Sequence, residues 1–155
     1  MVLLVLLLFV VTSKKIDELL KEVDEADDET APKEGLLELS SQTFKKITNE
    51  DKYVFVLFYD PTCPHCKKVI PRFRQLGFLM KDSTDFIVAQ LDCDMYHSYC
   101  HKQSFLKGYP SLFLFHNGTI YQEYKMSYSP EAMKDFVLYL IKESQNNQHP
   151  QKTEL

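Results

Sequence analysis

The sequence predicts an α/β fold in which helices cover both faces of one central mixed sheet. Apolar runs rich in β-branched and aromatic residues alternate with segments of helical periodicity, and a hairpin and a last helix end the pattern. Residues 53–59 are apolar almost throughout, which predicts a strand buried on both faces. Such a strand needs a helical layer on each side, so the expected arrangement is helix, sheet, helix.

The first two elements are expected to be short. Residues 36–39 form an apolar run that predicts the first strand. Ser40 or Ser41 is placed to cap a helix that carries Phe44 and Ile47.

The central strand, residues 53–59, leads directly into a helix over residues 63–80. Pro71 lies inside that helix and predicts a kink, because proline cannot donate the internal hydrogen bond. Residues 85–91 predict a third strand, and a helix is expected from about residue 96 to 106.

A hairpin and a helix complete the expected domain. Residues 111–115 and 119–124 predict two strands joined across an Asn-Gly pair, which favours a tight hairpin turn. Residues 130–143 predict the last helix, because apolar residues recur at helical spacing and Pro130 suits the first turn.

Composition limits the class of protein. The 155 residues are enough for one domain with a substantial core, and 11 Phe and 9 Tyr supply its aromatic content. Against 18 basic residues there are 22 acidic ones, a net charge of −4. This balance argues against a nucleic-acid partner.

Residues 1–13 are predicted to be a secretory signal peptide that is cleaved after Ser13. Residues 3–11 are apolar but too few to span a bilayer comfortably, and Val11 and Ser13 fit the small-residue pattern before a cleavage site. The segment carries no Lys or Arg, and a membrane anchor or a buried strand is the alternative. After cleavage no membrane segment is expected.

Polar segments flank the expected domain. Residues 14–35 are strongly acidic and are interpreted as a linker, with a calcium-binding or partner-docking arm as the alternative. Residues 144–155 are predicted to be a disordered polar tail. The chain ends in KTEL, which is similar to the KDEL and HDEL signals, although Thr replaces Asp. We therefore expect residence in the endoplasmic reticulum lumen and binding to a retrieval receptor; a chance polar tail is the alternative.

The motif Cys63-Pro64-His65-Cys66 is the strongest indication of chemistry. It places two thiols at a strand-to-helix junction, where free backbone N–H groups and the helix dipole favour a thiolate. A thiolate is the species that attacks disulfides, so the motif predicts redox exchange. An inert structural disulfide is the alternative.

Residues 36–143 resemble a single thioredoxin-fold domain of the protein disulfide isomerase family. The resemblance is carried by the run VLFYDPTCPHCK at residues 56–67, by Pro71, by the triplet Gly-Tyr-Pro at residues 108–110, and by residues 113–118. These motifs occur in the family's order and spacing. The resemblance implies the thioredoxin fold and thiol–disulfide chemistry.

The resemblance also implies roles for individual residues. Cys63 would attack and Cys66 would resolve the mixed disulfide, while the His65 imidazolium would stabilise the Cys63 thiolate. A Pro-His pair between the cysteines also occurs in the bacterial periplasmic oxidant DsbA, which predicts an oxidising site. The family's cis-proline corresponds to Pro110, and unfolded chains would contact the apolar surface formed by Pro64, Tyr109 and Pro110.

Three positions depart from the family pattern. Leu57 stands where members carry a buried acid that relays protons to the second cysteine. Tyr128 stands where many carry an Arg, and Thr62 replaces the common Trp. These departures predict slow proton transfer at Cys66.

The other two cysteines have a place in the same family. Cys93 and Cys100 match a structural disulfide found in some disulfide isomerase domains; a metal site with His97 and His101 is the alternative. Asn117 begins an Asn-Gly-Thr glycosylation sequon in an expected exposed turn.

The expected function is that of a thiol–disulfide oxidoreductase that forms and rearranges disulfides in cysteine-containing proteins of the lumen. Its chemistry needs no metal and no other cofactor. Its partners would be unfolded or partly folded clients and a reoxidising protein whose identity the sequence does not indicate. A client-binding module with little turnover is the alternative.

Overall fold

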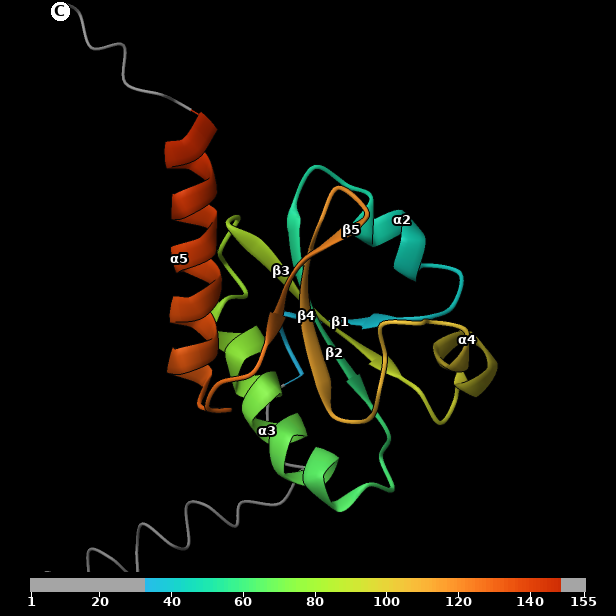
Figure 1. Ribbon diagram of the computed structural model, residues 1–155. Coiled ribbons are helices and arrows are strands. Elements are labelled where there is room, and N and C mark those ends of the chain that lie inside the picture. Colours follow the sequence, from blue (N-terminus) through green and yellow to red (C-terminus); the bar gives the residue numbers. More distant parts are fainter. Residues whose placement is uncertain (1–32, 149–155) are drawn as a thin grey trace, which may run out of the picture. The chain divides into compact units, whose positions relative to one another are not determined.

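A five-stranded mixed sheet forms the centre of the computed structural model, which describes residues 33–148 (Figure 1). Its strand order is β1-β3-β2-β4-β5. The strands β1, β3 and β2 run parallel, whereas β4 is antiparallel to β2 and β5 is antiparallel to β4. The strand bounds are β1 Leu36–Leu39, β2 Tyr53–Tyr59, β3 Phe86–Asp92, β4 Ser111–His116 and β5 Thr119–Tyr124.

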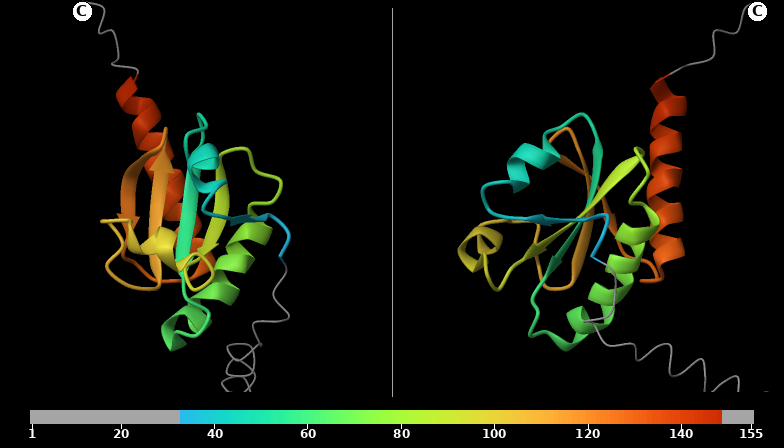
Figure 2. Two further views of the ribbon diagram at one scale, coloured as in Figure 1. Left: turned by 90° about the vertical axis from the view of Figure 1, so that its right-hand side faces the viewer. Right: turned by 180° about the vertical axis from the view of Figure 1, so that it is seen from behind.

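Helices cover both faces of this sheet, which confirms the predicted fold class. The longer helices, α3 (Pro64–Leu79) and α5 (Pro130–Gln148), lie together on one face. The short helices, α2 (Phe44–Thr48) and α4 (His97–His101), lie on the opposite face (Figure 2).

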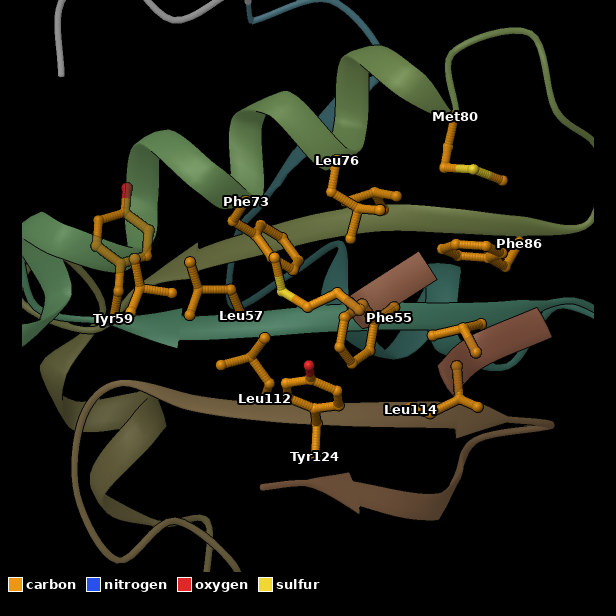
Figure 3. Packing of buried hydrophobic residues seen from close by; sticks show 14 of the residues in the cluster. Phe55, Leu57, Tyr59, Phe73, Leu76, Met80, Phe86, Leu112, Leu114 and Tyr124 are labelled. Atoms are coloured by element: carbon orange, nitrogen blue, oxygen red, sulfur yellow. The ribbon is translucent and has the colours of Figure 1, made fainter. Parts of the chain in front are cut away.

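The central strand β2 contributes side chains to both halves of the core. Val54, Val56 and Phe58 pack toward α2 and α4, whereas Phe55 and Leu57 pack toward α3 and α5 (Figure 3). All five are fully buried. Each large apolar side chain of this kind stabilises the fold by about 1.5–3 kcal/mol through burial, so β2 and the turn that follows it are firmly anchored in the core.

Two predicted helix ends are wrong by five residues each, and the N-cap residue of α2 is Thr43 instead of Ser40 or Ser41. Helix α4 ends at His101, five residues early, because Phe105 packs its ring against Phe58 in the core, 5.7 Å between centroids. Helix α5 continues to Gln148, whereas it was expected to end at residue 143 and to be followed by a disordered polar tail. The sequence after the buried Ile141 is rich in Lys, Glu and Gln, which extend a helix at little cost.

Several predicted segments lie outside the described residues. These are the signal peptide over residues 1–13, all but the end of the acidic segment, and the KTEL terminus. Within residues 33–148, no helix combines the length and the apolar composition needed to cross a membrane.

Candidate active site

The dithiol lies where β2 gives way to α3. Cys63 is the N-cap residue, with extended backbone angles of φ −72° and ψ 124°, and its carbonyl accepts the N–H of Lys67 at 3.1 Å. Pro64 occupies the first helical position, where its missing N–H leaves no bond unmade. The Cys63 sulfur therefore lies beside the free N–H groups of the first turn.

The two thiols differ in exposure and in acidity. Both are free, but Cys63 is partly exposed whereas Cys66 is fully buried. Hydrogen bonds from the backbone N–H of Cys66, and more weakly from that of His65, hold the pKa of Cys63 below its ordinary value. Burial raises the pKa of Cys66 to about 11. At neutral pH, Cys63 is therefore the better nucleophile of the two.

The loop before β4 lies next to the dithiol, although the two are far apart in the sequence. The Tyr109–Pro110 peptide bond is cis, and the carbonyl oxygen of Tyr109 lies 3.8 Å from the Cys63 sulfur. Tyr109 and Pro110 are half-buried, and Pro64 is exposed. The Tyr109 carbonyl thus lies beside Cys63, the chain neighbour of Pro64, and client contact by Pro64, Tyr109 and Pro110 remains a prediction.

His65 is exposed on the first turn of α3. His65 helps to lower the pKa of Cys63 through a hydrogen bond from its backbone N–H. The imidazole was the group singled out from the sequence, and its role remains a prediction.

The floor beneath Cys66 is apolar at the position where the family's acid was expected. Leu57 is fully buried in the same core cluster as Cys66, and the partly buried Tyr128 packs against that cluster. Gln90, the register neighbour of Leu57 on β3, is buried as well. Its amide nitrogen donates to Glu38 at 2.5 Å, while its amide oxygen has no partner among the described residues.

Asp60 and Thr62 form a polar turn that the sequence analysis missed. One oxygen of the Asp60 carboxylate accepts both the backbone N–H and the hydroxyl of Thr62, each at 2.7 Å. These bonds hold the pKa of Asp60 below its usual value. Its negative charge weakly opposes the lowering of the Cys63 pKa by the backbone N–H groups, and it adds to the burial that raises the pKa values of Cys66 and Tyr109. The signal was an Asp two residues before a Thr, which is a common turn pattern.

Comparison with known proteins agrees with this geometry. The thioredoxin family model matches residues 35–139. Protein disulfide-isomerase 5-1 of Arabidopsis thaliana is 34% identical over 107 residues, which cover 68% of this chain and 73% of that protein. This chain belongs to the protein disulfide isomerase family.

Some other relatives of this chain are much longer. Protein disulfide isomerase-like 2-1 of Oryza sativa subsp. japonica is 34% identical over 109 residues, 70% of this chain but only 30% of that protein. Among solved structures, the J-Trx1 fragment of ERdj5 superposes with a TM-score of 0.63 at 24% identity, covering 70% of this chain and 52% of that one. That structural likeness supports the thioredoxin fold.

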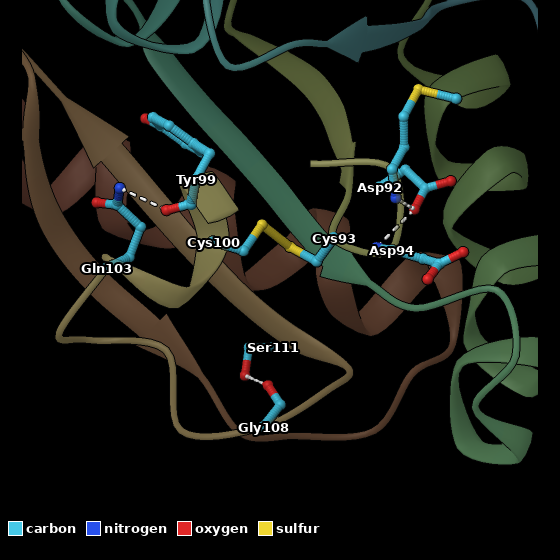
Figure 4. The surroundings of a disulfide bond; sticks show 9 residues. Asp92, Cys93, Asp94, Tyr99, Cys100, Gln103, Gly108 and Ser111 are labelled. Atoms are coloured by element: carbon cyan, nitrogen blue, oxygen red, sulfur yellow. Dashed lines mark hydrogen bonds between the residues drawn. A yellow bond between two sulfur atoms is a disulfide. The ribbon is translucent and has the colours of Figure 1, made fainter. Parts of the chain in front are cut away.

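A disulfide joins Cys93 and Cys100 in this disulfide isomerase family member (Figure 4). The two Cα atoms are 5.7 Å apart, and each cysteine is only 1% exposed. The sulfurs that a metal site would have used are therefore bonded to each other. His97 and His101 stack on one another at the surface, with ring centroids 5.9 Å apart.

The sequon residue Asn117 lies in the turn between β4 and β5. It is exposed and has a positive φ of 50°, which asparagine tolerates better than most residues. The turn geometry leaves its side chain accessible, and glycosylation there remains a prediction.

Proposed function

We propose that this protein is a thiol–disulfide oxidoreductase that forms and rearranges disulfides in client proteins through Cys63 and Cys66. The observation that carries the proposal is the opposite setting of the two thiols. One is partly exposed with a lowered pKa, and the other is buried with a pKa of about 11. This pairing suits a nucleophile that receives the client and a partner that closes the site afterwards.

In the oxidising direction, a client thiolate attacks the Cys63 sulfur of the Cys63–Cys66 disulfide. The bond between the two cysteines breaks, and Cys66 leaves and takes up a proton. A second client thiolate then attacks the client sulfur of the mixed disulfide and expels Cys63 as a thiolate. The client loses two electrons and the dithiol gains them. Pro64, Tyr109 and Pro110 supply the surface against which the client chain lies.

Rearrangement uses the reduced pair. The Cys63 thiolate attacks a wrong disulfide of the client, which forms a mixed disulfide and frees one client thiolate. Client thiolates then exchange with other client disulfides. Finally, a client thiolate attacks the client sulfur of the mixed disulfide and releases Cys63 as a thiolate. Cys66 ends an unproductive complex by attacking the Cys63 sulfur of the mixed disulfide: the bond from Cys63 to the client breaks, the client sulfur leaves as a thiolate, and the Cys63–Cys66 disulfide forms. His65 would add a positive charge near Cys63 and favour the oxidising direction.

We further propose that the protein works in the endoplasmic reticulum lumen. The apolar start of the chain, the KTEL end and the sequon at Asn117 support this location, as does similarity to protein disulfide isomerases. Its partners there would be cysteine-containing clients, a retrieval receptor and a reoxidising protein.

A second candidate is a module that holds clients with little turnover. Leu57 favours it, because no carboxyl group lies at that position to take the proton from buried Cys66. A mixed disulfide at Cys63 would then persist.

Refolding of scrambled ribonuclease separates the two candidates. An oxidoreductase accelerates recovery of ribonuclease activity, Cys63→Ser abolishes the effect, and Cys66→Ser leaves ribonuclease trapped on Cys63. Lack of acceleration, with stable adducts already in the wild type, would favour the holding module. A glutathione titration tests the oxidising site separately, and a thioredoxin-like potential of about −270 mV would contradict it.

A further inference from the structure

Asp60 is fixed in position between β2 and α3. Its carbonyl accepts the N–H of Cys63 at 3.1 Å, which ties its backbone to the start of the helix. Its carboxylate accepts two hydrogen bonds from Thr62 through a single oxygen. The side chain is therefore held at the turn that precedes the dithiol.

Two groups that can carry negative charge, the Cys63 sulfur and the Asp60 carboxylate, lie at the N-terminal end of α3. Backbone N–H groups there stabilise negative charge on the Cys63 sulfur. The Asp60 carboxylate stands at the same end, and its bonds to Thr62 keep it ionised at neutral pH. Two like charges near one helix end repel, so a Cys63 thiolate forms less readily than it would beside a neutral residue.

The other titratable groups around Cys63 come from two elements. Helix α3 contributes His65, Lys67 and the buried Cys66, and the loop before β4 contributes Tyr109. Among these and Asp60, the Asp60 carboxylate is the group that bears a negative charge at neutral pH before the dithiol reacts.

We propose that the negative charge of the Asp60 carboxylate, which Thr62 holds in place, makes the dithiol less oxidising. The same charge disfavours anionic thiols and disulfides as substrates. The inference rests on the proposed function and deepens it. A thiolate stabilised in the reduced protein makes a stronger oxidant, and a nearby carboxylate acts in the opposite direction. The same charge repels an approaching substrate that carries carboxylates of its own.

The reaction that reports this effect is exchange with glutathione. The oxidised protein and two glutathione thiols give the reduced protein and one glutathione disulfide, with two electrons passing to Cys63 and Cys66. Each glutathione carries two carboxylates, so its attack also reports repulsion by Asp60.

Asp60→Asn is the direct test, because the amide keeps an oxygen that can accept from Thr62 while it removes the charge. Asp92→Asn is a matched control: Asp92 ends β3, the strand beside β2, and accepts the backbone N–H groups of Asp94 and Met95 at 2.9 and 3.0 Å (Figure 4).

Three measurements follow for each variant: the pKa of Cys63 from thiolate absorbance, the glutathione equilibrium constant, and rates with anionic and cationic small disulfides. Asp60→Asn should lower the pKa of Cys63 by about half a unit and shift the equilibrium about threefold toward the reduced protein. It should also speed reaction with glutathione disulfide more than with the cationic disulfide cystamine. Asp92→Asn should change none of these.

The proposal is overturned if Asp60→Asn leaves the pKa of Cys63 and the charge preference unchanged, or if Asp92→Asn changes them equally. Asp60→Ala provides a second charge-removing variant if the asparagine variant does not fold. Failure of the proposed function looks different: the wild type itself would then not exchange with glutathione, while the thiolate titration would still report on Asp60.

Discussion

Replacing Leu57 by Glu restores a carboxyl group beneath the dithiol and tests whether proton transfer limits Cys66. Leu57 is fully buried in the cluster that holds Cys66, and its register neighbour Gln90 has an amide oxygen without a partner among the described residues. With a thiol pKa of about 11, only about one Cys66 in ten thousand is a thiolate at pH 7. A carboxylate nearby would take that proton during attack on Cys63, and general base catalysis of this kind contributes about 100-fold or more.

The same substitution has a cost in stability that depends on pH. Losing a buried leucine lowers the free energy of unfolding by about 2 kcal/mol. A protonated carboxyl group that donates a hydrogen bond to Gln90 would recover about 1 kcal/mol of this loss. Burial raises the folded-state pKa of the new carboxyl above its unfolded value of about 4.3. Stability relative to wild type therefore falls as pH rises from about 4.3 to the folded pKa, by about 1.4 kcal/mol per pH unit.

The assay is the reaction of the reduced protein with dithionitrobenzoate. Cys63 first forms a mixed disulfide and releases one thionitrobenzoate, and Cys66 then displaces the second. Leu57→Glu should speed the second release by about 100-fold or more at a pH where the new carboxyl group is ionised, without slowing the first. Leu57→Gln is the matched control, because it adds a polar group that cannot take the proton. Equal second-phase rates in the two variants would refute proton transfer as the limit.

Three further predictions concern the scaffold. Replacing Cys93 and Cys100 by Ala should lower the free energy of unfolding by about 2.5 kcal/mol, measured by urea denaturation, because the bond closes a loop of sequence separation 7. Gly35→Ala should lower the free energy of unfolding by about 2 kcal/mol or more, since φ is +77° and the new Cβ would lie 2.1 Å from a backbone oxygen of α3. Gly108→Ala is the control and should lower it by under about 0.5 kcal/mol, because there is open space around Gly108. Equal melting temperatures of the two variants would contradict this prediction. Expression in secretory cells should give a band that shifts with glycosidase and is lost in Asn117→Gln; an unshifted wild-type band would contradict it.

Much of the fold was predictable because its signals are local. The unbroken apolar run of β2, the Asn-Gly turn and the spacing of the last helix each specify one element without reference to the rest of the chain. The position of Cys63 at the start of α3 was predictable in the same way, because the apolar run of β2 leads directly into a helical segment.

The boundaries that were wrong depend on distant contacts. Phe105 continues the pattern of a helix in the sequence, but its ring packs against Phe113, 5.1 Å between centroids, so the chain leaves the helix at His101. The local sequence around residue 105 does not predict that contact.

The polar features of the site were harder still to predict. Thr62 was interpreted only as the loss of a tryptophan, yet its hydroxyl and N–H orient Asp60. The bond between Gln90 and Glu38 joins residues 52 positions apart through two neighbouring strands. Such pairs become visible only when the register of the strands is known.

The bond from the N–H of Cys93 to the carbonyl of Tyr59, 2.7 Å long, ties the loop of the buried disulfide to the strand that ends just before the reactive turn. Because the sulfurs of Cys93 and Cys100 are shielded while Cys63 is accessible, a reducing agent meets the two sulfur pairs in a fixed sequence. Under the proposed function, the protein therefore has a redox hierarchy: Cys63 and Cys66 cycle between dithiol and disulfide while the inner Cys93–Cys100 bond stays closed. Mild reduction changes the chemical state of the site without loosening the strand ends on which it is built.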